Sequence, residues 1–177
     1  MRSLAALLAA ALTLALAGTA AADTFVVVPP SGGAGGQVAT PAAVPFSTTP
    51  AQGPVTLSTL RQLWVSAGRA YGIPWQVLAA INKVESDFGR NLGPSSAGAV
   101  GWMQFMPSTW ARWGMDANGD GVADPNNPAD AIYSAARYLA AAGGRYDLRR
   151  AIFAYNHAVW YVNDVLALAA RYAAEYR

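Results

Sequence analysis

The sequence predicts one all-α domain, which covers residues 56–177. Apolar residues recur there at the three- and four-residue spacing of amphipathic helices, segment after segment. No run alternates apolar and polar residues in the way that predicts a half-buried strand. With 177 residues, 54% of them hydrophobic, the chain can build one hydrophobic core and is small for two domains.

The first 22 residues have the order of a secretory signal peptide. A positively charged start precedes an apolar stretch from Leu4 to Ala17, and small residues up to Ala22 offer a cleavage site before Asp23. The apolar stretch is shorter than the roughly 20 residues that a membrane-spanning helix needs. Cleavage is therefore favoured over the alternative, a retained membrane anchor. We expect a secreted or cell-envelope protein with no stable membrane insertion after cleavage.

Residues 23–55 are the next predicted unit, a disordered tether. From Val28 to Pro54 the chain consists mainly of Pro, Gly, Ala, Ser and Thr, with almost no large apolar residue apart from Phe46. Such a segment cannot bury enough surface to offset the entropy of ordering it. Two interpretations stay open: a spacer that carries the domain away from the membrane, or a linker with no function of its own.

The first two predicted helices are separated by a short break. Thr56 or Ser58 offers an N-cap for the first helix, and Gly72 supplies its stop. Pro74 suits the first position of the second helix, which is expected to end before Gly89. The expected apolar stripe of this second helix consists of Val77, Leu78, Ile81, Val84 and Phe88.

Four further helices follow a loop rich in Gly, Ser and Pro. A short one opens at Pro107, a longer one starts at Pro128 and is terminated by Gly143, and Asp147 caps the next. The last helix has apolar residues at helical spacing, namely Val162, Val165, Leu166, Ala169 and Tyr172.

The amino-acid composition of the chain excludes several classes of function. The chain has no cysteine, which excludes disulfides, thiol nucleophiles, thiolate metal sites and a lipidated cysteine. The net charge is only +2 and the arginines are scattered, so no nucleic-acid-binding surface is predicted. The single histidine, His157, has no second His or Cys nearby, so we expect a structural residue and no zinc site.

Glu85 is the candidate for acid–base chemistry. It follows an apolar residue, Val84, in the last turn of the second helix, where the helix dipole disfavours a negative charge. We therefore expect a raised pKa for Glu85, and a carboxyl group protonated near neutral pH can act as a general acid. The alternative is a solvated surface residue that pairs with Lys83 or Arg90.

Three short segments occur in order along the chain: Glu85-Ser86, Gly101-Trp102-Met103-Gln104 and Ala154-Tyr155-Asn156. Together they resemble the signature motifs of the lytic transglycosylases of the lysozyme-like superfamily, over nearly all of the predicted domain. The middle motif runs on into Gln-Phe-x-Pro-Ser-Thr-Trp and is similar to that of the membrane-bound B-type and related actinobacterial enzymes. Trp102 stands where the large soluble type has leucine.

The resemblance implies a lysozyme-like fold and cleavage of the β-1,4 bond between N-acetylmuramic acid and N-acetylglucosamine in peptidoglycan. It implies that Glu85 acts first as acid and then as base. The substrate-binding residues that it implies are Ser86, Met103, Gln104, Tyr155 and Asn156. Each has a structural alternative: Ser86 ends a helix, Met103 fills the core, and the two amides satisfy loop carbonyls. We expect a monomer whose partner is the peptidoglycan glycan strand.

The acidic residues are compatible with a single catalytic carboxyl group. Ordinary glycosidases use two carboxyl groups about 5 to 9.5 Å apart. Asp87, the nearest acid in sequence, lies two positions further along a helix and so points away from Glu85. The mechanism that the resemblance implies needs no cofactor, because the sugar's own 6-hydroxyl attacks and a 1,6-anhydro product forms. A muramidase that hydrolyses, like goose-type lysozyme, and an inactive wall-binding module remain alternatives.

An acidic loop has the spacing of an EF-hand calcium site. Its ligand positions one, three, five, seven, nine and twelve hold Asp116, Asn118, Asp120, Val122 through its carbonyl, Asp124 and Asn127. Gly121 occupies the turn position, while Asn127 replaces the usual bidentate Glu, so calcium would bind weakly or with unusual geometry. The loop predicts a structural calcium ion, and a metal-free turn is the alternative.

Aromatic residues are numerous for so small a domain. Most are expected in the core, and some are expected to stack on sugar rings in a groove, although sequence does not sort one from the other. They are Trp75, Trp102, Phe105, Trp110, Trp113, Tyr133, Tyr155 and Trp160.

Overall fold

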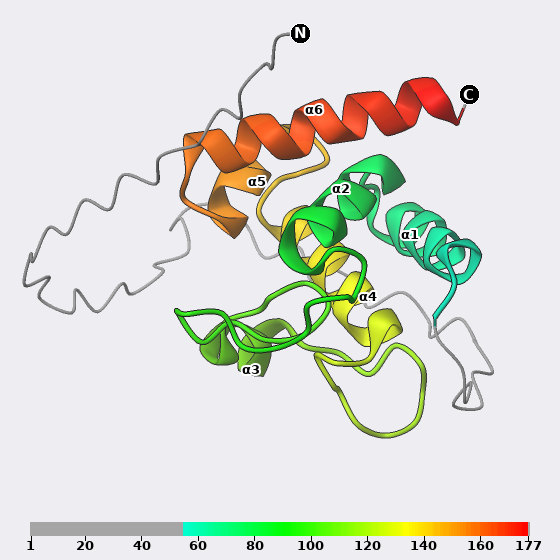
Figure 1. Ribbon diagram of the computed structural model, residues 1–177, viewed down its shortest axis with the longest axis vertical. Coiled ribbons are helices and arrows are strands. Elements are labelled where there is room, and N and C mark those ends of the chain that lie inside the picture. The colour runs from blue at the N-terminus through cyan, green and yellow to red at the C-terminus, as the bar shows by residue number, and fades with distance from the viewer. Residues whose placement is uncertain (1–54, 177) are drawn as a thin grey trace, which may run out of the picture. The chain divides into compact units, whose positions relative to one another are not determined.

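A computed structural model describes residues 55–176, and this range is helical. The signal peptide and nearly all of the tether were predicted for residues outside it. The helices are α1 (Leu57–Tyr71), α2 (Trp75–Ser86), α3 (Pro107–Trp113), α4 (Pro128–Ala141), α5 (Leu148–Tyr155) and α6 (Val159–Glu175) (Figure 1). The described residues contain no strand beyond an isolated antiparallel bridge between Val100 and Phe105. The all-α prediction is confirmed.

Side-chain caps start three of these helices, and those of α1 and α5 were predicted from the sequence. The Thr56 hydroxyl accepts a hydrogen bond from the Thr59 amide at 3.2 Å, which decides between the two candidate caps of α1. Asn127 caps α4 and Asp147 caps α5 through their side-chain oxygens. None of the helices in the described range has the length and apolarity that a membrane span requires.

The end of α2 differs from the prediction. The helix stops at Ser86, because Asp87 and Phe88 adopt left-handed backbone conformations with φ of 50° and 58°. Phe88 therefore lies outside the helix, where its ring packs on that of Trp64 with centroids 5.3 Å apart. Val84 is 36% exposed instead of buried. The expected apolar stripe was wrong at these two positions: Phe88 lies beyond the sharp turn that ends the helix, and Val84, although helical, faces solvent.

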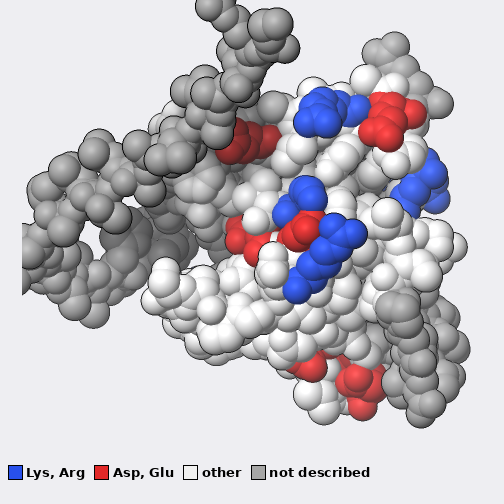
Figure 2. Space-filling model, viewed as in Figure 1, with Lys and Arg blue, Asp and Glu red and all other residues white. Residues whose placement is uncertain are grey.

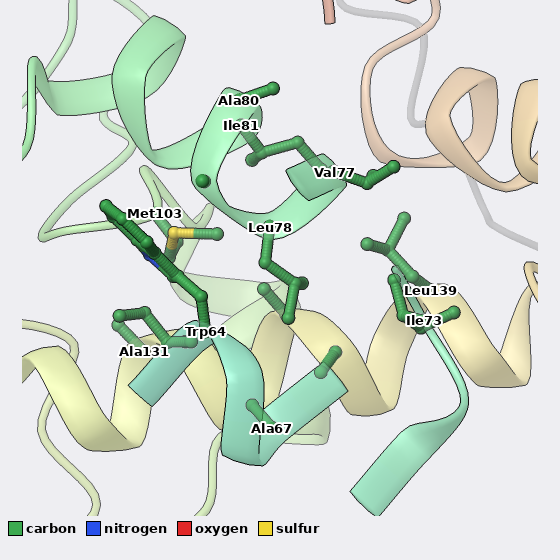
Figure 3. Packing of buried hydrophobic residues seen from close by; sticks show 14 of the residues in the cluster. Trp64, Ala67, Ile73, Val77, Leu78, Ala80, Ile81, Met103, Ala131 and Leu139 are labelled. Atoms are coloured by element: carbon green, nitrogen blue, oxygen red, sulfur yellow. The ribbon is translucent and has the colours of Figure 1, made fainter. Parts of the chain in front are cut away.

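The core is centred on α2, which packs against α1, α4 and α6. Figure 3 shows Leu78 of α2 pointing toward the side chains that α1 and α4 contribute, and Ile81 belongs to the same buried cluster. Met103 joins this cluster from the loop between α2 and α3. Three helices thus pack around α2, whose last turn carries Glu85.

The loop before α3 rests on the acidic loop before α4. The Trp102 amide donates to the Pro125 carbonyl at 3.0 Å, and the Trp102 indole donates to the Asn126 carbonyl at 2.9 Å. Gly101 permits this approach, because a Cβ atom there would lie 2.0 Å from the Pro125 oxygen, and its φ of 78° also favours glycine. The two loops therefore support each other on one side of α2.

Replacing Gly101 by alanine is expected to lower the free energy of unfolding by about 3 kcal/mol, since the new Cβ would push the two loops apart. Gly98→Ala is the matched control, because Gly98 has a similar φ of 86° but open space at its Cβ position. The control should lose only about 1 kcal/mol. Urea unfolding of the two variants measures the difference, and equal losses would contradict close packing at Gly101.

Candidate active site

Glu85 lies in the last turn of α2 and is partly buried. Its Oε1 atom accepts a hydrogen bond of 2.5 Å from the hydroxyl of Tyr161, which is 1% exposed near the start of α6. Burial raises the pKa of Glu85 to about 7, and the Tyr161 hydrogen bond opposes this rise by stabilising the charged form. The pKa of Glu85 is therefore raised, as expected, with burial as its largest cause.

A second phenol, that of Tyr155 at the end of α5, lies close to this pair. Burial raises the pKa of Tyr155 well above its usual range, and the negative charge of Glu85 raises it further. The Tyr155 hydroxyl donates to the Met103 carbonyl at 2.7 Å, so it ties α5 to the loop before α3. Glu85 thus sits between helices α5 and α6, each of which supplies one neutral tyrosine.

The neighbouring charges pair with Asp87 and not with Glu85. Lys83 and Arg90 both form salt bridges with the Asp87 carboxylate, and these hydrogen bonds lower the pKa of Asp87. Figure 2 shows basic and acidic side chains lying together in the middle of one face, over the end of α2. The alternative in which Lys83 or Arg90 pairs with Glu85 is therefore excluded, and Asp87 is already engaged elsewhere.

Two buried polar side chains of α2 hold the loop that carries the middle motif. The Ser86 hydroxyl donates to the Trp102 carbonyl at 2.7 Å and accepts from the Gly89 amide at 3.0 Å. The Asn82 amide donates to the same Trp102 carbonyl at 2.9 Å. Ser86 is only 1% exposed, and these hydrogen bonds position the chain around Glu85, which favours its structural alternative; substrate binding by Ser86 stays a prediction. The sequence analysis did not identify Asn82 as a structural residue of the site, because Asn82 belongs to none of the three motifs.

Side chains of the middle motif lie partly in the core and partly at the surface. Met103 is 0% exposed and its side chain fills the core, which favours its structural alternative; substrate binding by Met103 stays a prediction. Gln104 is partly exposed and has a left-handed φ of 46°, an uncommon conformation for a residue other than glycine. The side-chain amide of Gln104 donates to the Gly101 carbonyl at 3.0 Å, so Gln104 satisfies a loop carbonyl group, as its structural alternative predicted.

The third motif ends α5 and leads into α6. Asn156 is the C-cap of α5 and is partly exposed, and its carbonyl accepts from the Ala158 amide at 2.8 Å. This tight connection brings Tyr161 onto Glu85, 76 positions away in the chain. No motif in the sequence marked Tyr161, although an aromatic residue one or two helical turns after the third motif is a signal that a search could have used.

The acidic loop is held together by its own carboxylates. Both Asp116 oxygens accept backbone amides, from Gly119 at 2.7 Å and from Gly121 at 2.8 Å. Asp130, which is fully buried in α4, accepts the amides of Ala117 at 2.8 Å and Asp124 at 3.0 Å. Sequence analysis missed Asp130 because it lies beyond the twelve positions of the calcium pattern.

The proposed calcium ligands are only in part arranged for a metal ion. Asn127, at the twelfth position, uses its side-chain oxygen to cap α4. Among residues 55–176, no three His, Cys, Asp or Glu side chains come together as a group that could hold a metal. The remaining positions still present the hard oxygen donors that calcium prefers, from Asp116, Asn118, Asp120 and Asp124.

The structure shows which of the aromatic residues are buried and which are exposed, a distinction that the sequence did not provide. Trp102, Phe105 and Tyr133 are at most 6% exposed and belong to the core, whereas Trp160 is 62% exposed. His157 is exposed, and its ring packs edge-on against Phe153 with centroids 5.3 Å apart.

A hollow of about 870 Å³ lies between α1 and the start of α2, and Glu85 does not line it. The candidate active site is therefore identified by the chemical properties of Glu85 and its neighbours, and not by the volume of a cavity.

Comparison with solved structures agrees with this fold. The Escherichia coli lytic transglycosylase SLT35 in complex with calcium superposes with a TM-score of 0.60 at 19% identity, covering 67% of this chain and 72% of that one. The same protein in complex with bulgecin A gives 0.61 at 19% identity, with 67% and 71% covered. SltB3 from Pseudomonas aeruginosa, in complex with NAG-anhNAM-pentapeptide, gives 0.57 at 17% identity, with 64% and 60% covered. The lysozyme-like helical fold is confirmed.

Sequence comparison leads to the family. Membrane-bound lytic murein transglycosylase B of Escherichia coli (strain K12) is 46% identical over 59 residues, which are 33% of this chain and 16% of that protein. The match therefore spans about a sixth of the length of this curated relative. The sequence pattern of the Transglycosylase SLT domain matches residues 62–175, which include all three motifs around Glu85. This chain belongs to the transglycosylase SLT domain family of enzymes.

Proposed function

We propose that this protein is a peptidoglycan lytic transglycosylase of the cell envelope, with Glu85 as its single catalytic acid. The supporting observation is a partly buried carboxyl group whose pKa, at about 7, leaves roughly half of it protonated at neutral pH. The similarity to a murein transglycosylase and to lytic transglycosylase SLT35 of Escherichia coli supports the substrate class. The proposed bond is the β-1,4 link between N-acetylmuramic acid and N-acetylglucosamine.

In the first step, Glu85 gives its proton to the glycosidic oxygen as the bond to the anomeric carbon breaks. N-acetylglucosamine leaves with a new hydroxyl group, and positive charge develops on the muramic acid ring. The 2-acetamido oxygen of that sugar stabilises the anomeric carbon. Glu85 is then a carboxylate, and the Tyr161 hydroxyl, already 2.5 Å from Oε1, stabilises the charge by donating its hydrogen bond.

In the second step, Glu85 removes the proton from the 6-hydroxyl of the same sugar, whose oxygen bonds to the anomeric carbon. The product is a 1,6-anhydro sugar, no water is consumed, and the carboxyl group regains its proton. This cycle needs no second carboxylate and no cofactor. The NAG-anhNAM-pentapeptide in complex with SltB3 supports an anhydro product for this fold.

The residues around Glu85 have distinct proposed roles. Tyr155 and Tyr161 stay neutral, since burial raises the pKa of both. They limit the access of water, while Gln104 and Asn156, both partly exposed, offer amide groups to the sugars. Ser86 acts through the loop that it holds.

Replacing Glu85 by Gln is expected to reduce cleavage by about 100- to 10,000-fold, because the amide cannot donate the required proton. Asp87→Asn is the matched control: it removes a carboxylate two positions away that is already paired with Lys83 and Arg90. Release of soluble fragments from purified peptidoglycan measures the activity. Full activity of the Glu85→Gln variant would contradict the assignment of the acid.

Mass spectrometry of the released fragments separates the candidate functions. Anhydro ends support the lytic transglycosylase, reducing ends would indicate a hydrolysing muramidase, and a folded wild-type protein that releases nothing would indicate a wall-binding module. Only the first result agrees with the proposed function.

The pH profile tests the role of Tyr161. Because the acid form of Glu85 disappears as the pH rises through about 7, kcat/KM should fall above neutrality. Tyr161→Phe removes a hydrogen bond that lowers the pKa of Glu85, so this alkaline limb should move to higher pH. Tyr138→Phe is the control, since the Tyr138 hydroxyl bonds to the Ala154 carbonyl instead. A limb that moves to lower pH in Tyr161→Phe would contradict the proposed role.

We also propose that the loop from Asp116 to Asn127 binds a structural calcium ion. The supporting observations are the four side-chain oxygen donors at the expected positions, together with the backbone carbonyl group of Val122, and Gly121 at the turn, with a φ of 93°. SLT35, which shares the fold, forms a complex with calcium. A bound ion would neutralise the carboxylates of the loop and stabilise the surface on which Trp102 rests.

Calcium is expected to raise the melting temperature by about 2 to 5 °C at millimolar concentration, with EDTA reversing the shift. Asp120→Ala should abolish this shift, because it removes a proposed ligand. Asp164→Ala, which removes an exposed carboxylate on α6, should keep it. Thermal unfolding followed by circular dichroism measures the shift. A melting temperature that changes with neither calcium nor EDTA would contradict the proposed calcium site.

A further inference from the structure

Trp160 differs from every other tryptophan of the protein. All six tryptophans lie within residues 55–176, and Trp160 alone is exposed, at 62%, while the other five are buried or partly buried. Val159, the residue before it, is 64% exposed. Large aromatic side chains gain the most from burial, so an exposed tryptophan beside an exposed aliphatic residue is a candidate contact surface when it adjoins a functional site.

The ring of Trp160 adjoins the candidate active site. Consecutive helical residues point about 100° apart, so Trp160 faces outward while Tyr161, the next residue of α6, faces inward. The two rings nevertheless touch edge-on, with centroids 5.9 Å apart and an interplanar angle of 77°. Since the Tyr161 hydroxyl bonds to Glu85, Trp160 lies one aromatic ring away from the residue that carries the proposed catalytic carboxyl group.

The helix segment that carries Trp160 is held in place by packing and by a hydrogen bond. The buried side of α6 carries Tyr161, Val162 and Val165, each at most 1% exposed, and packs against α2. The start of the helix is tied to the third motif, because the Ala158 amide donates to the Asn156 carbonyl. A ring held in this way loses little conformational freedom when it binds a flat partner.

We propose that Trp160 is a platform on which a sugar ring of the peptidoglycan glycan strand stacks, next to the bond that Glu85 cleaves. This inference rests on the proposed function. The β-1,4-linked N-acetyl sugars carry their large substituents equatorially, so each ring presents a face of C–H groups that matches an indole. The continuity of Trp160 with Tyr161 and Glu85 selects a glycan strand over a protein partner.

The test separates binding from cleavage by using Glu85→Gln as the background. Isothermal titration calorimetry with soluble, uncrosslinked glycan strands gives the Kd of this parent and of the same protein with Trp160→Ala, Trp160→Phe or Tyr146→Ala added. Tyr146, 95% exposed on the turn between α4 and α5, is the matched exposed aromatic residue. We expect binding about 5- to 10-fold weaker for Trp160→Ala, within about twofold of the parent for Trp160→Phe, and unchanged for Tyr146→Ala.

Kinetics in the active protein give a second readout. Trp160→Ala should lower kcat/KM mainly through KM, while the alkaline limb of the pH profile stays in place. A limb that moves as in Tyr161→Phe would overturn the proposal, because it would mean that Trp160 acts only by supporting the Tyr161–Glu85 hydrogen bond. Melting temperatures of all variants establish that each is folded.

The outcomes distinguish this inference from the proposed function. Unchanged glycan affinity in the Trp160→Ala variant overturns the platform while leaving Glu85 as the acid, provided that the wild-type protein cleaves. Failure of the wild-type protein to cleave and of the Glu85→Gln parent to bind overturns the proposed function and the platform together. Weaker binding in Tyr146→Ala as well would overturn the site, because exposed aromatic residues would then bind glycan without regard to position.

Discussion

The partial removal of one carboxyl group from water is the constraint on which the proposed chemistry depends. Glu85 bonds to the buried Tyr161 of α6, with the partly buried Tyr155 of α5 close by, and burial raises the pKa of Glu85 to about 7. Burial alone would keep the group protonated and weaken it as a base, but the Tyr161 hydrogen bond stabilises the carboxylate and opposes that effect. The balance leaves a side chain that can both give and take a proton near neutral pH.

The rest of the domain maintains this balance by holding the end of α2. The left-handed residues Asp87 and Phe88 end the helix directly after Ser86, so the chain turns back over its own last turn. Asn82 and Ser86 then hold the Trp102 carbonyl, and the loop beyond Trp102 meets Tyr155 through the Met103 carbonyl. All three motifs are thereby joined by hydrogen bonds to backbone atoms, and three motif side chains, those of Ser86, Trp102 and Met103, are buried in the same region.

The acidic loop contributes to the same support from the other side. Asp130, buried in α4, accepts amides from both ends of this loop, and the loop in turn accepts the amide and indole of Trp102. Burial raises the pKa of Asp130, although its backbone hydrogen bonds oppose the rise. The loop therefore has a structural task of its own, to which a calcium ion would add.

The sequence by itself determined the helices of residues 55–176 and most of their caps, because helical periodicity and capping depend on residues only three or four positions apart. Its three short motifs also pointed to Glu85. Only the tertiary structure decided which side chains are withdrawn from water: Ser86 and Met103 are buried, Trp160 is exposed, and Tyr161 reaches Glu85 from 76 positions away. Burial and partners depend on contacts between distant helices, and a pattern along one helix does not contain that information.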